Sequence, residues 1–175
     1  MDNLVTDLEQ IKILAQQNHD DFEVLGYMLE LHEETPDDVI DTWVDSIAKP
    51  IIEAIDCTQC GNCCRSLDVY VTPDDVQRLS TGIVIPLDTI MTDIDNESAP
   101  KVGEWGKFKA KPCGFLDGNL CSVYAHRPET CRTYPVFTPD FRWTIDDTIE
   151  GASICPIIYN VLTTLHDRID DLYRL

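Results

Sequence analysis

Eight cysteines are the residues of this sequence whose type and spacing predict a chemistry. Four of them form the motif Cys57-Thr-Gln-Cys60-Gly-Asn-Cys63-Cys64. A two-residue spacing lets successive thiolates point inward around a tight turn, and Gly61 supplies the permissive backbone that such a turn needs. Thiolates bind zinc and iron, so we predict a metal centre. The predicted metal-ligating residues are Cys57, Cys60, Cys63, Cys64, Cys113, Cys121, Cys131 and Cys155.

The spacing of the first three cysteines favours an iron–sulfur cluster as the cofactor. Cys57, Cys60 and Cys63 reproduce the C-x2-C-x2-C run of bacterial ferredoxins, in which a remote cysteine before a proline completes a ligand set. The pair Cys155-Pro156 can supply that remote cysteine. Zn²⁺ is the alternative cofactor, although four-cysteine zinc sites usually use two C-x2-C pairs and this chain has no second pair. Disulfides or unligated thiols are a third alternative.

The remaining candidate ligands are less clear from the sequence. Side chains of adjacent residues diverge, so Cys63 and Cys64 are not expected to bind one mononuclear ion, and one of them would serve a second metal or a larger cluster. His126 lies between two cysteines and could substitute as a ligand, but a structural or surface role is the simpler interpretation. The chain contains no phosphate-binding glycine loop, HExxH motif or GxSxG motif. The residues therefore leave enzymatic activity undecided.

The charge of the chain is strongly negative but uneven. The 175 residues include 32 acidic and 13 basic side chains, for a formal net charge of −19. Nucleic acid and anionic membranes require a basic surface, so neither is an expected partner. Residues 101–142 carry a net positive charge, with seven basic and four acidic side chains, whereas residues 1–56, 57–100 and 143–175 are each net negative. These cations either offset the charge of a thiolate cluster or simply pair with acidic helices.

The sequence predicts a cytoplasmic protein. It has no apolar run of about 18 residues that could span a bilayer. Its first residues, Met1-Asp2-Asn3-Leu4, lack the basic and apolar segments of a signal peptide. In a reducing compartment, a high number of thiols indicates metal ligands or redox groups more often than structural disulfides. A protein or redox partner is expected, but the sequence does not identify it.

Hydrophobic periodicity predicts helices toward both ends of the chain. Apolar residues recur at helical spacing in residues 1–17, 22–31 and 156–174. The pentapeptide Thr-Pro-Asp-Asp-Val at 35–39 predicts another helix start, because threonine caps, proline favours the first turn and acids suit the positive end of the helix dipole. We expect that helix to run to about Ala48 and to be interrupted or to end near Pro50.

The same pentapeptide recurs at 72–76 and predicts a short helix, which we interpret as reuse of capping chemistry. The polar residues 92–104 predict a long loop. Within 113–124, the pair Asp117-Gly118 predicts a β-hairpin. A three-residue hairpin loop would place the thiols of Cys113 and Cys121 on one face, and a two-residue loop would place them on opposite faces.

The predicted fold class is mainly α with a small, irregular, cysteine-rich centre that includes a β-hairpin. Helices at both termini are expected to pack around a metal-binding core. The expected division is an acidic helical extension over 1–56, a cysteine-cluster metal-binding region over 57–155, and a C-terminal helix over 156–175 that packs on the same single domain.

Two segments of the sequence resemble a known family. CTQCGNCC at 57–64, followed by CGFLDGNLCSVYAHRPETCRTYP at 113–135, is similar to the CxxCxxCC family of zinc- or iron-chelating domains, the YkgJ-like cysteine cluster proteins. The resemblance covers about residues 57–155. It is carried at Cys113, Phe115, Leu116, Gly118, Cys121, Tyr124, Arg127, Pro128, Cys131, Arg132, Tyr134 and Pro135.

The resemblance implies a metal-binding or iron–sulfur protein. Flagellin lysine N-methylases share a similar cysteine pattern, which opens a less favoured possibility of a protein-modifying enzyme, but this short chain shows no recognisable adenosylmethionine-binding glycine motif. Within the matched segment, Pro128 is expected to start a short helix that fixes Cys131 one turn later. Arg127 and Arg132 are expected to support the cofactor by donating hydrogen bonds to sulfur or to neighbouring carbonyls. The alternative is that both arginines pair with the acidic helices.

Overall fold

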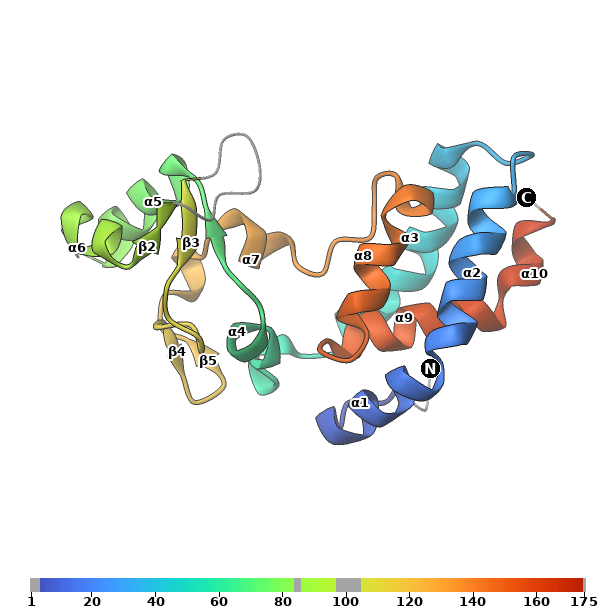
Figure 1. Cartoon of the computed structure of the whole chain (residues 1–175), viewed down its shortest axis with the longest axis horizontal. Coiled ribbons are helices and arrows are strands. Elements are labelled where there is room, and N and C mark those ends of the chain that lie inside the picture. Colours follow the sequence, from blue (N-terminus) through green and yellow to red (C-terminus); the bar gives the residue numbers. More distant parts are fainter. Residues whose placement is uncertain (1–3, 84–85, 97–104, 175) are drawn as a thin grey trace. The chain divides into compact units, whose positions relative to one another are not determined.

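The chain forms two compact units, each described here by itself (Figure 1). The computed structural model describes residues 4–83, 86–96 and 105–174. Residues 1–56 and 135–175 make up the helical unit, and residues 57–134 make up the cysteine unit. Helices with small antiparallel sheets account for the regular structure, which confirms the predicted mainly α fold class. The three-part domain division expected from the sequence stays a prediction.

The helical unit contains six helices in its described residues. Helices α2 and α3 each pack against α8 and α9, and α1 and α10 pack against α9 (Figure 1). Side chains with almost no exposure, such as Phe22, Leu25, Phe141 and Leu162, fill the space between them. None of the described helices is long and apolar enough to cross a membrane. The bounds are α1 Leu8–Gln17, α2 His19–Leu31, α3 Asp37–Ala54, α8 Phe141–Gly151, α9 Pro156–Asp167 and α10 Ile169–Leu172.

Helix α3 corrects the expectation that a helix ends near Pro50. It continues through Pro50 to Ala54. A proline inside a helix removes one backbone hydrogen bond, which normally favours termination. Here two apolar residues beyond it are buried, with Ile51 exposed to 3% and Ile55 to 7%. Burial of this last turn offsets the missing hydrogen bond, so tertiary packing overrides the local signal.

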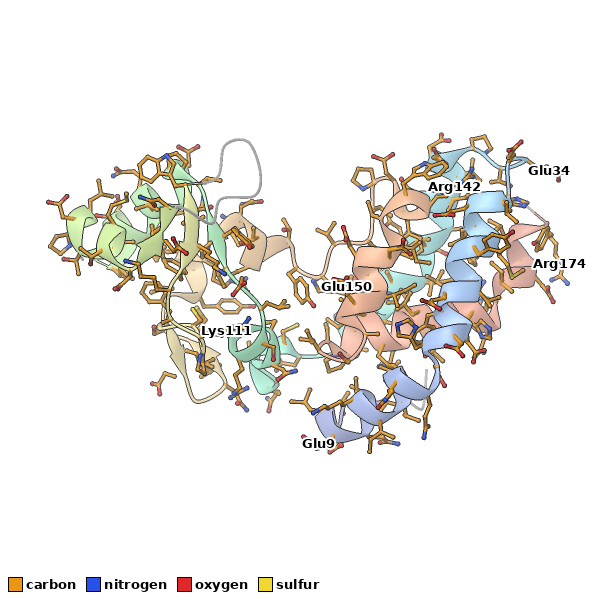
Figure 2. The ribbon with its side chains drawn as sticks, viewed as in Figure 1. Glu9, Glu34, Lys111, Arg142, Glu150 and Arg174 are labelled. Atoms are coloured by element: carbon orange, nitrogen blue, oxygen red, sulfur yellow. The ribbon has the colours of Figure 1, made fainter. Side chains whose placement is uncertain are left out.

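The first copy of the pentapeptide, at 35–39, lies at the start of α3. The Thr35 hydroxyl contacts His32 Nε2 at 2.7 Å, and the Thr35 carbonyl accepts a hydrogen bond from Arg142. Asp37 pairs with Arg142 Nε at 3.0 Å. Arg142 is buried and joins α8 to α3, whereas acidic side chains such as Glu9 and Glu150 are exposed (Figure 2).

The cysteine unit is built from short elements. Strand β3 (Gly106–Phe108) pairs antiparallel with β1 (Tyr70–Val71) on one side and with β2 (Ile94–Asp95) on the other. Helices α5 (Pro73–Ile83) and α6 (Leu87–Thr92) supply Val76, Leu79 and Ile90 to its apolar core. Its other elements are η1 Cys57–Gln59, α4 Asn62–Ser66, β4 Leu116–Asp117, β5 Leu120–Cys121, η3 Tyr124–His126 and α7 Glu129–Thr133.

Two sequence expectations meet the structure differently in this unit. The long loop expected over 92–104 lies largely outside the described residues, and its described part contains β2. The hairpin expected within 113–124 is present as β4 and β5, with Leu116 opposite Cys121 and Asp117 opposite Leu120. Its turn therefore consists of Gly118 and Asn119, the two-residue alternative.

Candidate metal centre

The CxxCxxCC motif folds as two tight turns around one glycine. Cys57 opens the 3₁₀ turn η1, and its carbonyl accepts hydrogen bonds from the backbone N–H groups of Cys60 and Gly61, both at 3.2 Å. Gly61 has φ 61°, and α4 starts directly after it. A Cβ atom at this position would lie 2.9 Å from the Asn119 carbonyl oxygen. Gly61 therefore permits both the left-handed turn and the close approach of the β4–β5 hairpin.

Arg65 fastens the motif to that hairpin and was not identified by sequence reasoning. Its guanidinium donates to the Cys60 carbonyl at 2.8 Å and to the Gly118 carbonyl at 2.7 Å. The Asn119 side chain donates in return to the Gln59 carbonyl at 2.9 Å. A planar guanidinium suits such a fork of acceptors. The available signal was a basic residue directly after the last cysteine of the motif.

The segment around Cys113 is attached to the motif by the backbone. The Cys113 N–H donates to the Cys64 carbonyl at 2.8 Å. The chain then turns, with the Leu116 N–H donating to the Cys113 carbonyl at 3.0 Å, before β4 begins. Because this turn breaks the strand alternation, Cys113 and Cys121 both line one cavity despite the two-residue hairpin loop.

Helix α7 supplies the last cysteine of this cluster. It begins after Pro128, whose carbonyl accepts the Cys131 N–H at 3.0 Å, as expected for a short helix started by that proline. Cys131 packs against the apolar core of the cysteine unit, and so does Cys121. The two thiols are therefore held on the inner side of their elements.

Six cysteines line one cavity of about 140 Å³ in the cysteine unit. Much of the remaining wall is apolar and comes from side chains such as Leu67, Val69, Phe108, Phe115 and Val123. The Cys63 and Cys64 sulfur atoms lie 4.0 Å apart, so these adjacent side chains converge where the sequence argument expected divergence. The cysteines of the cavity wall are Cys57, Cys63, Cys64, Cys113, Cys121 and Cys131.

The two other predicted ligands lie elsewhere in their units. Cys60 is half-buried and sits in the motif turn, outside the set of residues that line the cavity. Cys155 belongs to the helical unit, where it is buried and precedes α9. All eight cysteines are described, and none of them is in a disulfide.

Cys64 ionises more readily than an ordinary cysteine. A hydrogen bond from Cys63 is the main cause that lowers its pKa to about 6, and the positive charges of Arg65 and Arg127 act in the same direction against burial. A thiol with this pKa is mostly thiolate at neutral pH. Cys64 is therefore prepared to bind a metal ion without first losing a proton.

Three other thiols resist ionisation. Burial raises the pKa of Cys131 to about 12, and the nearby Cys113 and Cys64 sulfurs add to the effect. Burial is also the main cause that raises the pKa values of Cys113 and Cys121. Several thiolates in one apolar cavity repel each other, so this arrangement accommodates their charge only when a cation binds among them.

The two predicted supporting arginines are placed differently. Arg127 lines the cavity, donates to the Tyr124 carbonyl at 2.9 Å and stacks with its guanidinium carbon 3.5 Å from the centre of the Tyr124 ring. Arg132 is exposed, and its guanidinium lies 3.9 Å from the Glu129 carboxylate. Arg127 is therefore placed to offset the charge of thiolates in the cavity. Arg132 does not line the cavity, and its observed contact is with Glu129.

Two groups of residues that include a histidine lie outside the thiol cluster, one at His126 and one at His19. His126 packs its ring against Gly82 so closely that a Cβ at Gly82 would fall 2.2 Å from it, which favours the structural interpretation of this histidine. His19, Asp20 and Glu23 bring ligand atoms within 4.8 Å of one another on α2, but all three are exposed. Exposed groupings of this kind are common without an ion.

The donor set of the cavity fits a thiophilic metal. Soft thiolates select zinc, copper(I) and iron–sulfur clusters over calcium or magnesium, which prefer oxygen ligands. The cysteine unit carries ten acidic and eight basic residues, net −2, whereas the helical unit carries 22 acidic and five basic residues, net −17. The candidate centre therefore lies in the part of the chain that is nearly neutral before its thiols ionise.

The comparison with known families locates the same region. Residues 56–156, more than half of the chain, match the family model described as "CxxCxxCC: Putative zinc- or iron-chelating domain". No curated protein and no solved structure matches the chain.

Proposed function

The chain belongs to the CxxCxxCC family of zinc- or iron-chelating domains, and on that premise we propose that its cysteine unit binds an iron–sulfur cluster through cavity-lining thiolates. The observation that carries this proposal is that six cysteines line one cavity of about 140 Å³. A single tetrahedral zinc ion takes four ligands and occupies only the small space between them. More thiols than one ion can use, around an open volume, favour a polynuclear centre.

The wall of the cavity supports the same proposal. Apolar side chains such as Phe108 and Val123 exclude water, and solvent exposure is one of the factors that set the reduction potential of an iron–sulfur cluster. Such a cluster would serve electron transfer, redox sensing or the stability of the unit itself. Arg127 in the wall and Arg65 beside Cys64 would offset part of the negative charge of the ligands.

The cavity thiols would lose their protons in a definite order as the centre assembles. Cys64 offers a thiolate near neutral pH, so it is the expected first ligand. Cys131, whose pKa is raised to about 12, keeps its proton until the metal displaces it. Binding would therefore release protons, and the affinity would increase with pH.

A zinc-stabilised interaction module is the second candidate function. The observation that favours it is the 4.0 Å separation of the Cys63 and Cys64 sulfur atoms. In a tetrahedral site with Zn–S bonds of about 2.3 Å, two sulfur ligands lie about 3.8 Å apart. The adjacent thiols are thus spaced as two ligands of one ion. Two more cavity thiols would have to move closer to complete the site, because no three cysteine sulfur atoms in the described residues lie within 4.8 Å of one another.

Anaerobic purification followed by iron, sulfide and zinc analysis and a visible absorption spectrum decides between the two candidates. Iron and sulfide in comparable amounts with a brown colour support the cluster. Stoichiometric zinc without sulfide contradicts the cluster and supports the interaction module. Protein that is purified, reconstituted and found to hold neither metal overturns both.

Serine variants assign the ligands. Cys64→Ser and Cys131→Ser are expected to lose most of the metal, because both thiols line the cavity. Cys60→Ser and Cys155→Ser test the two predicted ligands that lie outside the cavity wall. Ser122→Ala is the matched control, since its side chain donates to the Phe115 carbonyl at 3.0 Å in the same hairpin and it contributes no thiol. Full metal content in both Cys64→Ser and Cys131→Ser would refute the cavity as the binding site.

A further inference from the structure

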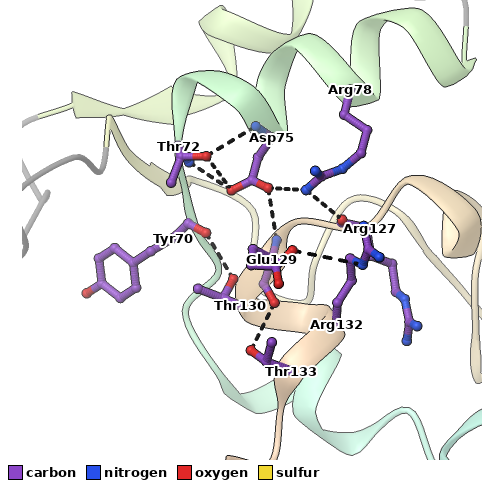
Figure 3. A network of polar contacts seen from close by, with 9 residues as sticks. All are labelled: Tyr70, Thr72, Asp75, Arg78, Arg127, Glu129, Thr130, Arg132 and Thr133. Atoms are coloured by element: carbon purple, nitrogen blue, oxygen red, sulfur yellow. Dashed lines mark hydrogen bonds and ion pairs between the residues drawn. The ribbon is translucent and has the colours of Figure 1, made fainter.

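A buried carboxylate stands behind the thiol cluster without belonging to it. Asp75 is only 2% exposed, although aspartate is among the residues that are rarely buried without partners. Its Oδ2 accepts hydrogen bonds from the backbone N–H and the hydroxyl of Thr72, both at 2.9 Å (Figure 3). The Thr72 hydroxyl in turn accepts the Asp75 N–H at 3.2 Å. These reciprocal contacts form a capping box at the start of α5.

The second oxygen of Asp75 reaches a different element. Oδ1 accepts the backbone N–H of Glu129, the first residue of α7, at 2.9 Å, and it also pairs with the Arg78 guanidinium (Figure 3). Arg78 donates further to the Arg127 carbonyl at 3.3 Å. One carboxylate therefore joins the start of α5 to the segment that carries Arg127 and begins α7.

Helix α7 depends on such contacts for its position. It has five residues, too few to be a stable helix by itself. Besides the Asp75 contact, the Thr130 hydroxyl donates to the Tyr70 carbonyl at 3.0 Å and attaches α7 to β1 (Figure 3). Cys131 follows Thr130 directly, so these contacts determine where its thiol lies.

We propose that Asp75 is a positioning residue of the metal centre, which fixes the first turn of α7 and through it the Cys131 thiol. The inference rests on the proposed metal-binding function. Asp75 is not among the residues that line the thiol cavity, and a capping role for α5 alone would require only its Oδ2 contacts with Thr72. The Oδ1 contacts with α7 and Arg78 make it a link between the fold of the unit and the geometry of the site.

The sharpest test removes the contact from the α7 side. Glu129→Pro eliminates the N–H that Asp75 accepts, and the backbone tolerates it because proline is favoured at a first helical position. The preceding residue, Pro128, already has the extended φ of −52° and ψ of 154° that a following proline requires. Glu129→Ala is the matched control, since it removes the same side chain, including its contact with Arg132, and keeps the N–H.

The measurement is the affinity of the chain for Zn²⁺, obtained by competition against a chromophoric chelator, together with the absorption spectrum of the Co²⁺-loaded protein. We expect Glu129→Pro to weaken Zn²⁺ binding by about tenfold, within the range for residues that orient metal ligands, and to change the thiolate-to-cobalt absorption. Glu129→Ala is expected to bind within about twofold of the unchanged chain. Equal affinities and spectra for the proline variant and the unchanged chain would overturn the proposal.

A second pair of variants approaches the contact from α5. Asp75→Asn is expected to weaken Zn²⁺ binding, because an amide cannot accept all the donors that surround both carboxylate oxygens. Asp38→Asn is its control, since Asp38 occupies the same place in the other copy of the pentapeptide and is exposed. If the two variants affect Zn²⁺ binding equally, the special role of Asp75 is wrong.

The route through Cys131 is tested by combining variants. In a Cys131→Ala background, Glu129→Pro is expected to cause no further loss of Zn²⁺ affinity, because the thiol that it misplaces is gone. A further loss of about tenfold would show that the contact acts elsewhere and would contradict the positioning role. Failure of the proposed function looks different: in that case the Cys131→Ala and Cys64→Ala variants bind Zn²⁺ as tightly as the unchanged chain.

Discussion

The two copies of Thr-Pro-Asp-Asp-Val start helices in different units and make different contacts. In the helical unit, Thr35 is buried and its hydroxyl contacts His32, while Asp38 is exposed. In the cysteine unit the aspartate is buried instead of the threonine. Asp75, the counterpart of Asp38, is 2% exposed and accepts a hydrogen bond from the first residue of α7. The predicted capping by threonine is confirmed only in the second copy, where the Thr72 hydroxyl accepts the Asp75 N–H. It is wrong for the first, because Pro36 is the N-cap of α3 and no side chain there makes a capping hydrogen bond. The same five residues therefore acquire their roles from the elements packed against them.

The difference extends to the units themselves. The helical unit buries long apolar faces of α2, α3, α8 and α9 against one another. The cysteine unit has strands of two or three residues, a smaller apolar cluster and six thiols around a cavity. Hydrophobic burial can stabilise the first unit alone, whereas the second resembles small domains that depend on a metal. Metal removal and a cavity in the helical core test whether the two units are stabilised in these different ways.

Metal removal is expected to have the largest effect. A structural zinc site contributes about 10–16 kcal/mol of binding free energy, which a unit with a small core replaces only in part. We expect a chelator under reducing conditions to lower hydrogen-exchange protection strongly in β3 and α7, so that the metal-free unit stays folded but is much less stable, and to leave the protection of α3 and α9 unchanged. Hydrogen exchange followed by mass spectrometry measures the two units in one sample. Equal loss of protection in both units, or in neither, would contradict the contrast.

The reverse perturbation is a cavity in the helical unit. Leu162 in α9 has no exposed surface, and replacing a buried leucine by alanine costs about 2–5 kcal/mol. We expect Leu162→Ala to lower the denaturation midpoint of the helical unit and to leave the metal content unchanged. Denaturant titration followed by circular dichroism, with metal analysis of the same protein, checks both parts. Coupled loss of metal would show that the cysteine unit needs the helical core.

The contrast also explains how far the sequence could predict the structure. Helices α1, α2 and α9 follow from apolar spacing, and the start of α3 follows from the pentapeptide. Helix α8 was not predicted, and the single helix predicted over 156–174 is divided into α9 and α10. The continuation of α3 through Pro50 depended on packing of Ile51 and Ile55. In the cysteine unit, the family motif identified the cysteines, and the proline before α7 predicted that helix. Arg65 and Asp75 were missed because their partners, Gly118 and Glu129, lie about 50 residues away, and no local pattern encodes such contacts.

The pH dependence of the metal-free cysteine unit is expected to rise and then fall. The pKa of Cys64 is lowered to about 6, so its contribution to the free energy of unfolding is present above the ordinary pKa of 9.0 and is lost as the pH falls through 6. The pKa of Cys131 is raised to about 12, so its contribution is present below 9.0 and is lost as the pH rises toward 12. Stability should therefore peak near pH 9.

Urea denaturation of the chelated, reduced protein between pH 6 and 11 tests this prediction. Cys64→Ser should flatten the rise between pH 6 and 9, and Cys131→Ala should reduce the fall at higher pH. The midpoint of the helical unit serves as the internal reference, because seven of the eight cysteines lie in the cysteine unit. A cysteine unit whose midpoint falls steadily from pH 6 onward would rule out the depressed pKa of Cys64.

The smallest expected effects come from the threonines that open the two pentapeptides. Thr72→Val removes the hydroxyl from the capping box of α5 and with it one of the hydrogen bonds that hold the Asp75 carboxylate, so we expect a loss of about 1 kcal/mol and a Zn²⁺ affinity reduced by a few fold. Thr35→Val removes a buried hydrogen bond to His32 at a similar cost of about 1–3 kcal/mol, but Thr35 belongs to the helical unit and not to the unit that holds the thiol cavity. Thermal denaturation and Zn²⁺ competition on both variants compare the copies directly. If Thr35→Val weakened Zn²⁺ binding as much as Thr72→Val, general destabilisation would explain both results, and the contacts that distinguish the second copy would have no separate influence on the thiols.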